Sequence, residues 1–531
     1  MYQLIALLFL LFAPLWSAPL KIHGIVLAEG DSNSVELQEV EGVFFEGISD
    51  PAIFESLRAE LEERFLNQEL TAEIVRSIQQ TILAFYDKLD RSFVIVSIPD
   101  QNVQNGVVSF TVQPIQAGTV TVSGNRWFNE RRLAQEFSIR EGEVLQKSQL
   151  LNQVAWLNQN PFRHAQLILS PAETGRETDL ELRIKDRFPA RFYSGVDNTG
   201  TEFSGSLRLF AGFNYGDLFG RGDLFTYQFT TSAPVRRFLA HYLNYTSFLR
   251  IQHQLILYGG YAESHPAISD FRSEAKNAQG SLRYNIPIKP LYAQVFQQLS
   301  FGADYKSLNS NLFFTSDIEE IPIVTHDVSI TQLVAGYQFH FTNPTHDTLF
   351  KIDCFASPAK WLGSQTTSRY QALRPGSEVR YFYGRIAAGE VLQIGRDWVF
   401  SSLLRAQVSS AALLSSEQFG FGGAETVRGY EERIFNADNA LCLNVELHSP
   451  HLSLFSKKAL YFLLFADLGK GWNYDATSGF SQTEPLIGVG PGIRYAINPY
   501  FTSRLDYGFQ LHSVPGDSSF GRFHFSLVAG Y

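Results

Sequence analysis

One arginine in the sequence needs a charged partner. Arg428 lies in residues 420–432, which read Gly-Phe-Gly-Gly-Ala-Glu-Thr-Val-Arg-Gly-Tyr-Glu-Glu and separate two segments of alternating polarity. The glycines let the backbone turn tightly. A guanidinium enclosed between strands is costly unless a carboxylate faces it, and the two planar groups then pair through two hydrogen bonds. Asp467, about forty residues later, is the candidate partner, and the alternatives are Glu425, Glu431 and Glu432.

Strand periodicity places Asp467 on a polar face. Side chains alternate between the two sides of a strand, so Phe465, Asp467 and Gly469 share one face. The opposite face is apolar and consists of Phe462, Leu464, Ala466 and Leu468. A paired Arg428 and Asp467 would contribute about 1–3 kcal/mol net. That is enough to hold a loop in place and small enough for the loop to be displaced.

Residues 189–531 carry the alternating pattern of a β-barrel. One face of each segment is apolar and aromatic, and the other carries Arg, Asn, Glu, Asp and Gln. Aromatic residues make up 14% of the chain and charged residues 18%, with no long apolar run. This composition favours many short strands with apolar side chains toward lipid and polar ones toward a wet lumen. At roughly twenty residues per strand and connection, the length predicts about sixteen antiparallel strands.

The residues before the barrel predict a leader and two small α+β modules. Residues 1–18 have the short apolar core and small-residue end of a secretory signal peptide. Residues 19–40 are interpreted as an N-terminal extension, interrupted by Gly24 and Gly30. Residues 41–116 and 117–188 each alternate strand, helix, helix, strand, strand. The fold class is therefore α+β modules followed by an all-β transmembrane barrel.

Several motifs resemble one superfamily of outer-membrane polypeptide transporters. Val427-Arg428-Gly429-Tyr430 resembles the signature on the inward-folded loop of BamA/TpsB barrels, and Phe465-x-Asp467-x-Gly469 resembles its partner motif on a barrel strand. The two modules resemble polypeptide-transport-associated (POTRA) domains, and the turn with Gly220 and Gly222 resembles a turn motif of the superfamily. The stretches that point to the TpsB, haemolysin-activator branch are Asn160-Pro161-Phe162-Arg163 and Asp197-Asn198-Thr199-Gly200-Thr201.

This resemblance implies two-partner secretion. It implies an outer-membrane pore, monomeric, with POTRA domains in the periplasm that recognise an unfolded TpsA-like exoprotein and pass it to the cell surface without ATP. The other partners it implies are outer-membrane lipid and the barrel assembly machinery, which would read the C-terminal strand ending at Tyr531. Some relatives have a plug helix, for which residues 19–40 leave little room. The alternatives are a membrane-insertion factor of the BamA/TamA kind, a porin and a barrel enzyme.

Other classes of function find little support in the sequence. The net charge of −10 and the lack of a basic stripe argue against nucleic acid as a partner. No hydrolase elbow, zinc-protease or Walker motif occurs, so we expect no catalytic residue, metal or cofactor. The two cysteines, Cys354 and Cys442, exclude a disulfide framework and are expected to be free buried thiols. The sequence identifies neither the client protein nor the trigger that opens the pore.

Overall fold

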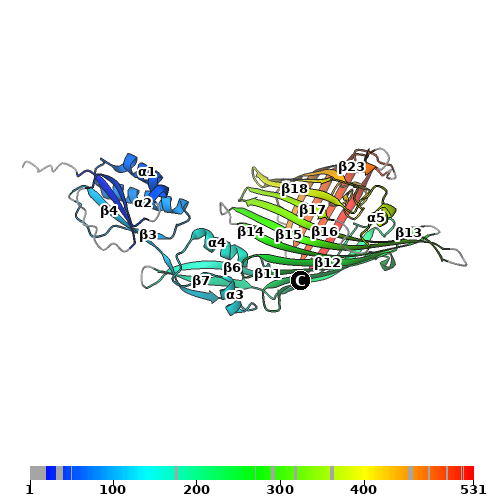
Figure 1. Ribbon diagram of the computed structural model, residues 1–531, viewed down its shortest axis with the longest axis horizontal. Helices are drawn as coiled ribbons and strands as arrows, with labels where there is room; N and C mark the ends of the chain where they lie inside the picture. Colours follow the sequence, from blue (N-terminus) through cyan, green and yellow to red (C-terminus); the bar gives the residue numbers. More distant parts are fainter. Residues whose placement is uncertain are drawn as a thin grey trace, which may run out of the picture. The chain divides into compact units, whose positions relative to one another are not determined.

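A computed structural model describes most of the chain in two compact units. The described residues are 20–30, 40–48, 51–103, 105–173, 177–268, 271–288, 294–315, 320–358, 364–452, 458–475, 479–497, 500–515, 517 and 519–531. The predicted signal peptide, 1–18, lies outside them. One unit contains the residues up to 159 and 163–186, and the other contains 160–162 and 187–531. Figure 1 colours the first unit blue to cyan and the barrel of the second green to red.

The first module is a four-stranded sheet covered by two helices. Strands β1 (Gly24–Glu29), β2 (Gly42–Glu46), β3 (Val94–Ser97) and β4 (Val107–Pro114) pair in the order β2-β1-β4-β3. The helical segments are η1 (Pro51–Phe54), α1 (Glu55–Phe65) and α2 (Ala72–Lys88). The prediction of an extension over 19–40 was wrong at β1, which pairs in parallel with both β2 and β4. Its run Ile-Val-Leu-Ala is buried because a central parallel strand is covered on both faces, so no polar alternation reveals it.

The second module has the predicted order of elements. It consists of β5 (Gln116–Ser123), α3 (Glu130–Glu136), α4 (Lys147–Leu157), β6 (Arg163–Pro171) and β7 (Glu177–Asp186), with sheet order β5-β7-β6. Asn129 caps α3 by accepting a hydrogen bond from the amide of Arg132, which satisfies one free amide of the first turn. Leu180, Leu182 and Ile184 alternate along β7 and are buried.

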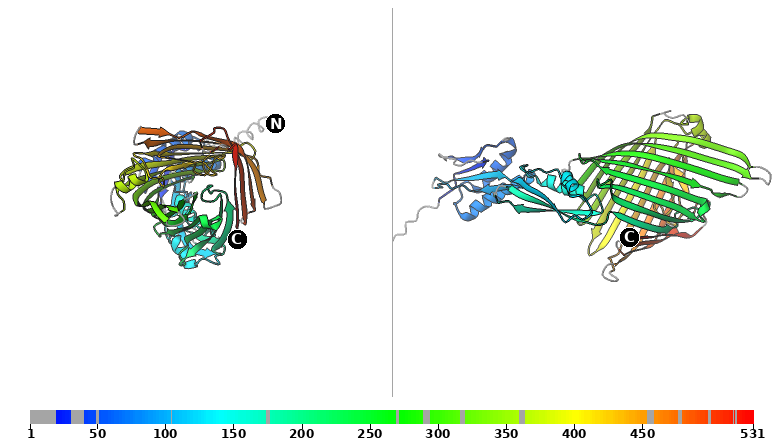
Figure 2. Two further views of the ribbon diagram at one scale, coloured as in Figure 1. Left: turned by 90° about the vertical axis from the view of Figure 1, so that its right-hand side faces the viewer. Right: turned by 90° about the horizontal axis from the view of Figure 1, so that it is seen from below.

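The second unit contains a closed antiparallel barrel, and the predicted number of sixteen strands is confirmed. Two of the sixteen are interrupted: β12 (Gln254–Ser264) with β13 (Ala267–Ile268), and β24 (Gly479–Gln482) with β25 (Leu486–Ile497). Figure 2 shows the ring of strands nearly end-on in its left view. The other fourteen are β8 (Ala190–Asp197), β9 (Leu207–Leu218), β10 (Asp223–Ala233), β11 (Phe238–Phe248), β14 (Phe271–Ile288), β15 (Val295–Thr315), β16 (Glu320–Thr342), β17 (His346–Ser357), β18 (Tyr381–Ile394), β19 (Trp398–Ser409), β22 (Asn439–His448), β23 (Lys458–Asp475), β26 (Phe501–Gln510) and β27 (Gly521–Gly530).

The two faces of the barrel wall differ as the alternation predicts. Leu464 is 63% exposed and points outward, whereas its neighbours Phe465 and Asp467 are 5% and 0% exposed and point inward. Outward apolar and inward polar side chains are the pattern of a barrel that lies in lipid around a wet lumen. No helix among the described residues is long and apolar enough to cross a membrane.

One long connection folds back against the inner wall. Residues 410–438, between β19 and β22, are called the infolded loop; they contain the short hairpin β20 (Phe419–Phe421) and β21 (Phe435–Ala437). Phe421, Val427 and Tyr430 of this loop are almost completely buried, at 1%, 0% and 0% exposure. The connection between β17 and β18 contains a short helix, α5 (Thr367–Leu373), on the same rim. This rim is opposite the one at which β8 begins and β27 ends.

Candidate functional site

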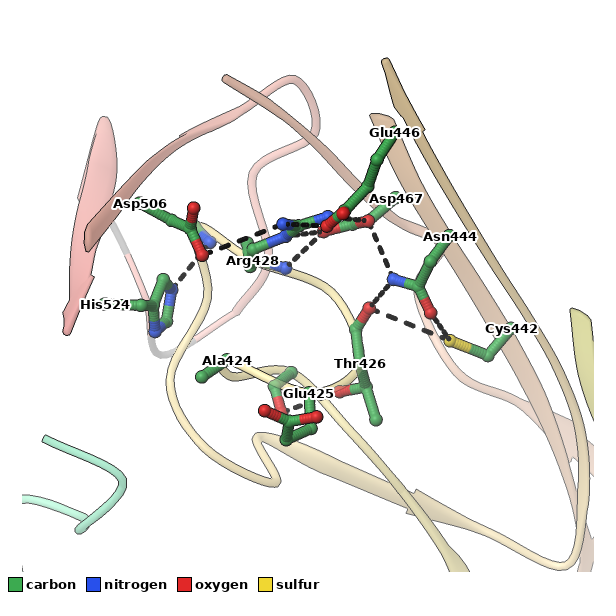
Figure 3. A network of polar contacts seen from close by, with 12 residues as sticks. Ala424, Glu425, Thr426, Arg428, Cys442, Asn444, Glu446, Asp467, Asp506 and His524 are labelled. Carbon is green, nitrogen blue, oxygen red and sulfur yellow. Dashed lines mark hydrogen bonds and ion pairs between the residues drawn. The ribbon is translucent and has the colours of Figure 1, made fainter. Parts of the chain in front are cut away.

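Arg428 and Asp467 form the contact that the sequence predicts. The guanidinium donates from Nε to Oδ2 at 2.7 Å and from Nη2 to Oδ1 at 2.8 Å, which is the bidentate geometry (Figure 3). The backbone amide of Arg428 donates to the same Oδ2 at 3.1 Å. Both side chains are buried, at 2% and 0% exposure. The carboxylate therefore fixes the side chain and the backbone of the loop tip together.

Two further wall carboxylates surround the guanidinium. Arg428 donates from Nη1 to Oε1 of Glu446 on β22 at 2.6 Å, and Nη1 lies 3.7 Å from Oδ2 of Asp506 on β26. The ring of Phe465 stacks on the guanidinium, with 3.6 Å from Cζ to the ring centroid. Periodicity indicates that Glu446 and Asp506 face the lumen, but the sequence alone did not identify them as partners of Arg428.

The three loop glutamates considered as alternative partners have other contacts. Glu425 accepts from Arg504 at 2.6 Å, Glu431 accepts from the amide of Glu202 at 3.0 Å, and Glu432 accepts from the amide of Ala424 at 2.7 Å. The alternatives were therefore wrong. The reason is geometric, because a loop carboxylate must turn back on its own chain to reach Arg428, whereas Asp467 already faces the incoming tip.

Neighbouring arginines keep the charge of the site balanced. Arg494 donates to both oxygens of Asp506, at 2.6 and 3.0 Å, and Arg504 donates to Oδ2 at 2.8 Å. Asn444 donates to Oδ1 of Asp467 at 2.7 Å and so occupies a remaining acceptor position of that carboxylate. Buried charges are tolerated when they are paired and their hydrogen bonds are satisfied, and both conditions hold for this network.

The other residues of the two motifs shape the contact surface. Gly429 adopts φ +99°, and its amide donates to Nε2 of His524 on β27 at 2.9 Å. The fully buried Tyr430 donates its hydroxyl to the carbonyl of His512 at 2.6 Å. Val427 is fully buried, and a Cβ on Gly469 would lie 2.9 Å from its Cγ2. The glycine of the wall motif thus makes room for the loop.

Two more wall glycines let the loop tip approach the strands closely. A Cβ on Gly488 of β25 would lie 1.9 Å from the carbonyl oxygen of Arg428, and one on Gly508 of β26 would lie 2.3 Å from the amide of Gly429. Contacts of this length are impossible for a side chain, so only glycine fits at either position. The sequence gives no indication of this pairing, because it depends on which strands face the tip.

The predicted turn motif lies on the other rim. Gly220 and Gly222, at φ +65° and +70°, form the turn between β9 and β10. The fully buried side chain of Asn160 donates to the carbonyl oxygens of Gly216 and Gly222 at 2.6 and 2.9 Å, and Phe162 packs on Gly216. The motif residues Asn160 and Phe162 therefore hold this turn. Neither contributes to the Arg428 site.

The structure also reveals ion pairs of the infolded loop that the sequence did not suggest. Asp438 is fully buried and binds Arg374, from the connection that contains α5, through both of its oxygens at 2.5 and 2.6 Å. Glu417 is fully buried too and accepts from Lys306 of β15 at 2.7 Å. Neither acid stands in a recognisable motif. Their partners lie 64 and 111 residues away, so only the folded barrel reveals them.

No described group of residues forms a persuasive metal centre. Glu263, His265 and Glu274 have ligand atoms within 4.8 Å of one another. The ammonium of Lys276, however, contacts Glu274 directly and lies 4.0 Å from Glu263, so a cation of the protein already stands beside both carboxylates. Both cysteines are free thiols; Cys442 is buried and Cys354 is half-buried.

Comparison with known proteins identifies the family. The model of the haemolysin secretion/activation protein family ShlB/FhaC/HecB matches residues 176–495. The heme/hemopexin transporter protein HuxB of Haemophilus influenzae is 21% identical over 465 residues, covering 84% of this chain and 80% of that protein. The outer membrane transporter CdiB of Dickeya dadantii is 20% identical over 449 residues, covering 81% and 76%.

Solved structures agree on the fold. CdiB from Escherichia coli superimposes with a TM-score of 0.79 at 14% identity, covering 98% of this chain and 92% of that one. CdiB from Acinetobacter baumannii gives 0.69 at 13% identity, covering 97% and 91%. The predicted architecture of two POTRA modules and a transmembrane barrel is thereby confirmed as a fold. Because the family model spans more than half of the chain, this protein belongs to the ShlB/FhaC/HecB family of haemolysin secretion/activation proteins of the outer membrane.

Proposed function

We propose that this chain binds an unfolded exoprotein through its periplasmic POTRA modules and passes it through the barrel lumen to the cell surface. The supporting observation is the infolded loop, whose Arg428 is held against Asp467 inside the lumen. A loop held inside the lumen by a small number of ion pairs can block the lumen at rest and still be displaced by a passing chain. In this proposal the Arg428–Asp467 pair controls opening.

The modules supply surfaces for an extended client. The first sheet has β2 and β3 at its edges, and the second has β5 and β6. Edge strands present backbone N–H and C=O groups that an extended segment can pair with by β-augmentation. The client would enter the lumen unfolded, and its folding outside the cell would make transport directional. ATP would not be required at any step.

The proposal assigns no catalytic residue, cofactor or metal to the chain. Its partners would be the exoprotein, outer-membrane lipid around the apolar outer wall, and the barrel assembly machinery during insertion. We propose that the chain functions as a monomer, because a closed sixteen-stranded barrel encloses a complete lumen without a second copy.

The function is tested by secretion of an exoprotein encoded beside this gene and co-expressed with it. Arg428→Ala should leave the amount of barrel in the outer membrane unchanged and abolish secretion. Arg433→Ala is the matched control, because Arg433 lies in the same loop, is exposed, and its guanidinium donates to Ser415 and Asn436 of the loop itself. Normal secretion by Arg428→Ala at equal membrane level would refute the role of the loop.

The barrel seam supports a second candidate, a factor that releases clients sideways into the membrane. Strands β27 and β8 pair over five residues, compared with nine for β26–β27 and eight for β8–β9. Ser194 and Ala529 are partners across this seam, and both are exposed on its outer side. A disulfide between Ser194→Cys and Ala529→Cys should leave secretion intact if clients use the lumen. Loss of secretion on oxidation, restored by reduction, would favour lateral release.

A further inference from the structure

The inner wall away from the Arg428 site carries a polar cavity of about 420 Å³. Its lining residues come from strands β11 to β18. The cavity extends from Gln298, near the periplasmic start of β15, to Tyr383, the third residue of β18 at the opposite rim. Amide, hydroxyl and charged groups lie along it, with tyrosine rings between them. Such a lining can bind the backbone of an extended chain without selecting one sequence.

The charges of this wall are unequal. The four cations of its lining are Arg283, Lys306, Lys351 and Arg385, and the two carboxylates are Asp304 and Asp353. The lining residues therefore carry a net charge of two positive units. Each carboxylate has its own wall cation, because Arg283 lies 2.7 Å from Asp304 and Lys351 lies 2.7 Å from Asp353. Lys306 and Arg385 are left over. Both bind the infolded loop.

Glu417 is the loop residue that binds them. Its carboxylate accepts hydrogen bonds from Lys306 at 2.7 Å, from Tyr383 at 2.7 Å and from Gln332 at 3.2 Å. Its carbonyl oxygen accepts from Arg385 at 2.9 Å. The side chain is fully buried. The first half of the infolded loop is therefore fixed across the cavity near its extracellular end.

Two of the ion pairs that hold the infolded loop to the wall have opposite polarity. Its acid, Glu417, binds basic groups of β15 and β18, while its base, Arg428, binds acids of β22 and β23. The wall at Arg428 is filled by closely packed loop backbone, as the approach to Gly488 and Gly508 shows. The polar cavity of β11–β18 lies on the side that Glu417 covers. A second cavity, of about 560 Å³, lies at the extracellular rim, where Tyr430 and Glu431 of the loop and His524 of β27 line it.

We propose that the wall formed by β11–β18 is the path of the client through the lumen, and that Glu417 closes its extracellular end. The proposal rests on the secretion function proposed above. An acidic side chain of an extended client can replace Glu417 on Lys306 and Tyr383, because it offers the same two acceptor oxygens. Closure would therefore be released by the client itself.

The closing role of Glu417 is tested with purified full-length protein in planar bilayers in KCl. Glu417→Gln should raise the open probability about tenfold or more, because a buried charge-assisted contact is lost. It should also make the open pore anion-selective, because Lys306 loses its counter-charge. Glu425→Gln is the matched control: Glu425 lies in the same loop and pairs with Arg504, but its side chain is 76% exposed. An open probability and selectivity like wild type for Glu417→Gln would overturn the proposal.

The path is tested with single cysteines in a Glu417→Gln background in which Cys354 and Cys442 are replaced by Ala. Gln279→Cys lies in the cavity on β14, and Tyr461→Cys lies on the luminal face of β23, toward the Arg428 side. The anionic reagent 2-sulfonatoethyl methanethiosulfonate should reduce the current at position 279 and leave it nearly unchanged at position 461. The reverse pattern would overturn the assignment of the wall.

Photo-crosslinking then follows the client itself. A benzoylphenylalanine at Tyr258, in the cavity, should crosslink to the co-expressed exoprotein during secretion, and one at Tyr461 should not. Crosslinks at position 461 alone would overturn the proposed path. The bilayer recordings use no client. If the proposed secretion function is wrong, no exoprotein will be secreted, but Glu417→Gln should still change the current.

Discussion

Replacing Arg428 by lysine separates its charge from its geometry. Arg428 makes three charge-assisted side-chain hydrogen bonds, two to Asp467 and one to Glu446. An ammonium is a point charge and cannot form the planar bidentate contact, so we expect it to retain about two of the three hydrogen bonds, one to each carboxylate. Each such bond contributes about 1.5–3 kcal/mol, and Asp467 keeps its bonds to Asn444 and to the loop amide. A net loss of about 1.5–3 kcal/mol corresponds to roughly 10- to 100-fold easier release of the loop.

Hydrogen exchange measured by mass spectrometry on the detergent-solubilised barrel reports this release directly. In Arg428→Lys the amides of residues 422–430 should lose protection by roughly 10- to 100-fold, because local opening sets their exchange rate. Amides of β22 and β23 should keep their protection, since the ladder between these strands is unchanged. Arg433→Lys serves as the control in the same loop. Unchanged protection of the tip in Arg428→Lys would refute the view that the ion pair holds the loop.

Three further changes test other contacts. The Gly508→Ala barrel should insert normally, but its new Cβ would lie 2.3 Å from the amide of Gly429 and displace the loop tip. Trypsin should therefore cut at Arg428, and a loop that stays uncut would contradict the close approach. Asn160→Ala should destabilise the β9–β10 turn by about 1–3 kcal/mol, because two buried carbonyls lose their donor, and faster amide exchange of the turn measures this. Arg163→Met removes one of the two cations that Glu136 contacts and leaves Arg132 at 3.1 Å, so the free energy of unfolding of the second module should fall by about 3–5 kcal/mol. In the full chain, this module should then become sensitive to protease at a lower urea concentration. An unchanged urea concentration would mean that the Arg163–Glu136 pair does not stabilise the module.

Local periodicity predicted much of the barrel. The alternation along residues 462–469 placed Asp467 in the lumen, and the motif pair then predicted its contact with Arg428. Strand number followed from length. Strand length did not: β15 and β16 have 21 and 23 residues, because nothing in the local pattern separates the part in lipid from the part beyond it.

The rest of the site depends on contacts between residues that are far apart in the sequence, which local patterns cannot predict. Glu446 and Asp506 could be placed on the luminal face, but which luminal acids meet Arg428 depends on how strands curve around the tip. Glu417 was not predicted, because a glutamate in a loop reads as solvated until the fold brings Lys306 to it. β1 was missed because its local sequence gives no strand signal, since a strand buried on both faces has no alternation of polar and apolar residues.

The hydrogen bond from Gly429 to His524 has a consequence for biogenesis. His524 belongs to β27, which comes last along the chain among the strands of the closed barrel, whereas Gly429 precedes it by 95 residues. The tip cannot complete its contacts until the final hairpin has joined the sheet. A tip bound to β27 therefore indicates that the barrel has closed. A protease that cuts an accessible tip would act on incompletely assembled barrels and leave closed barrels intact.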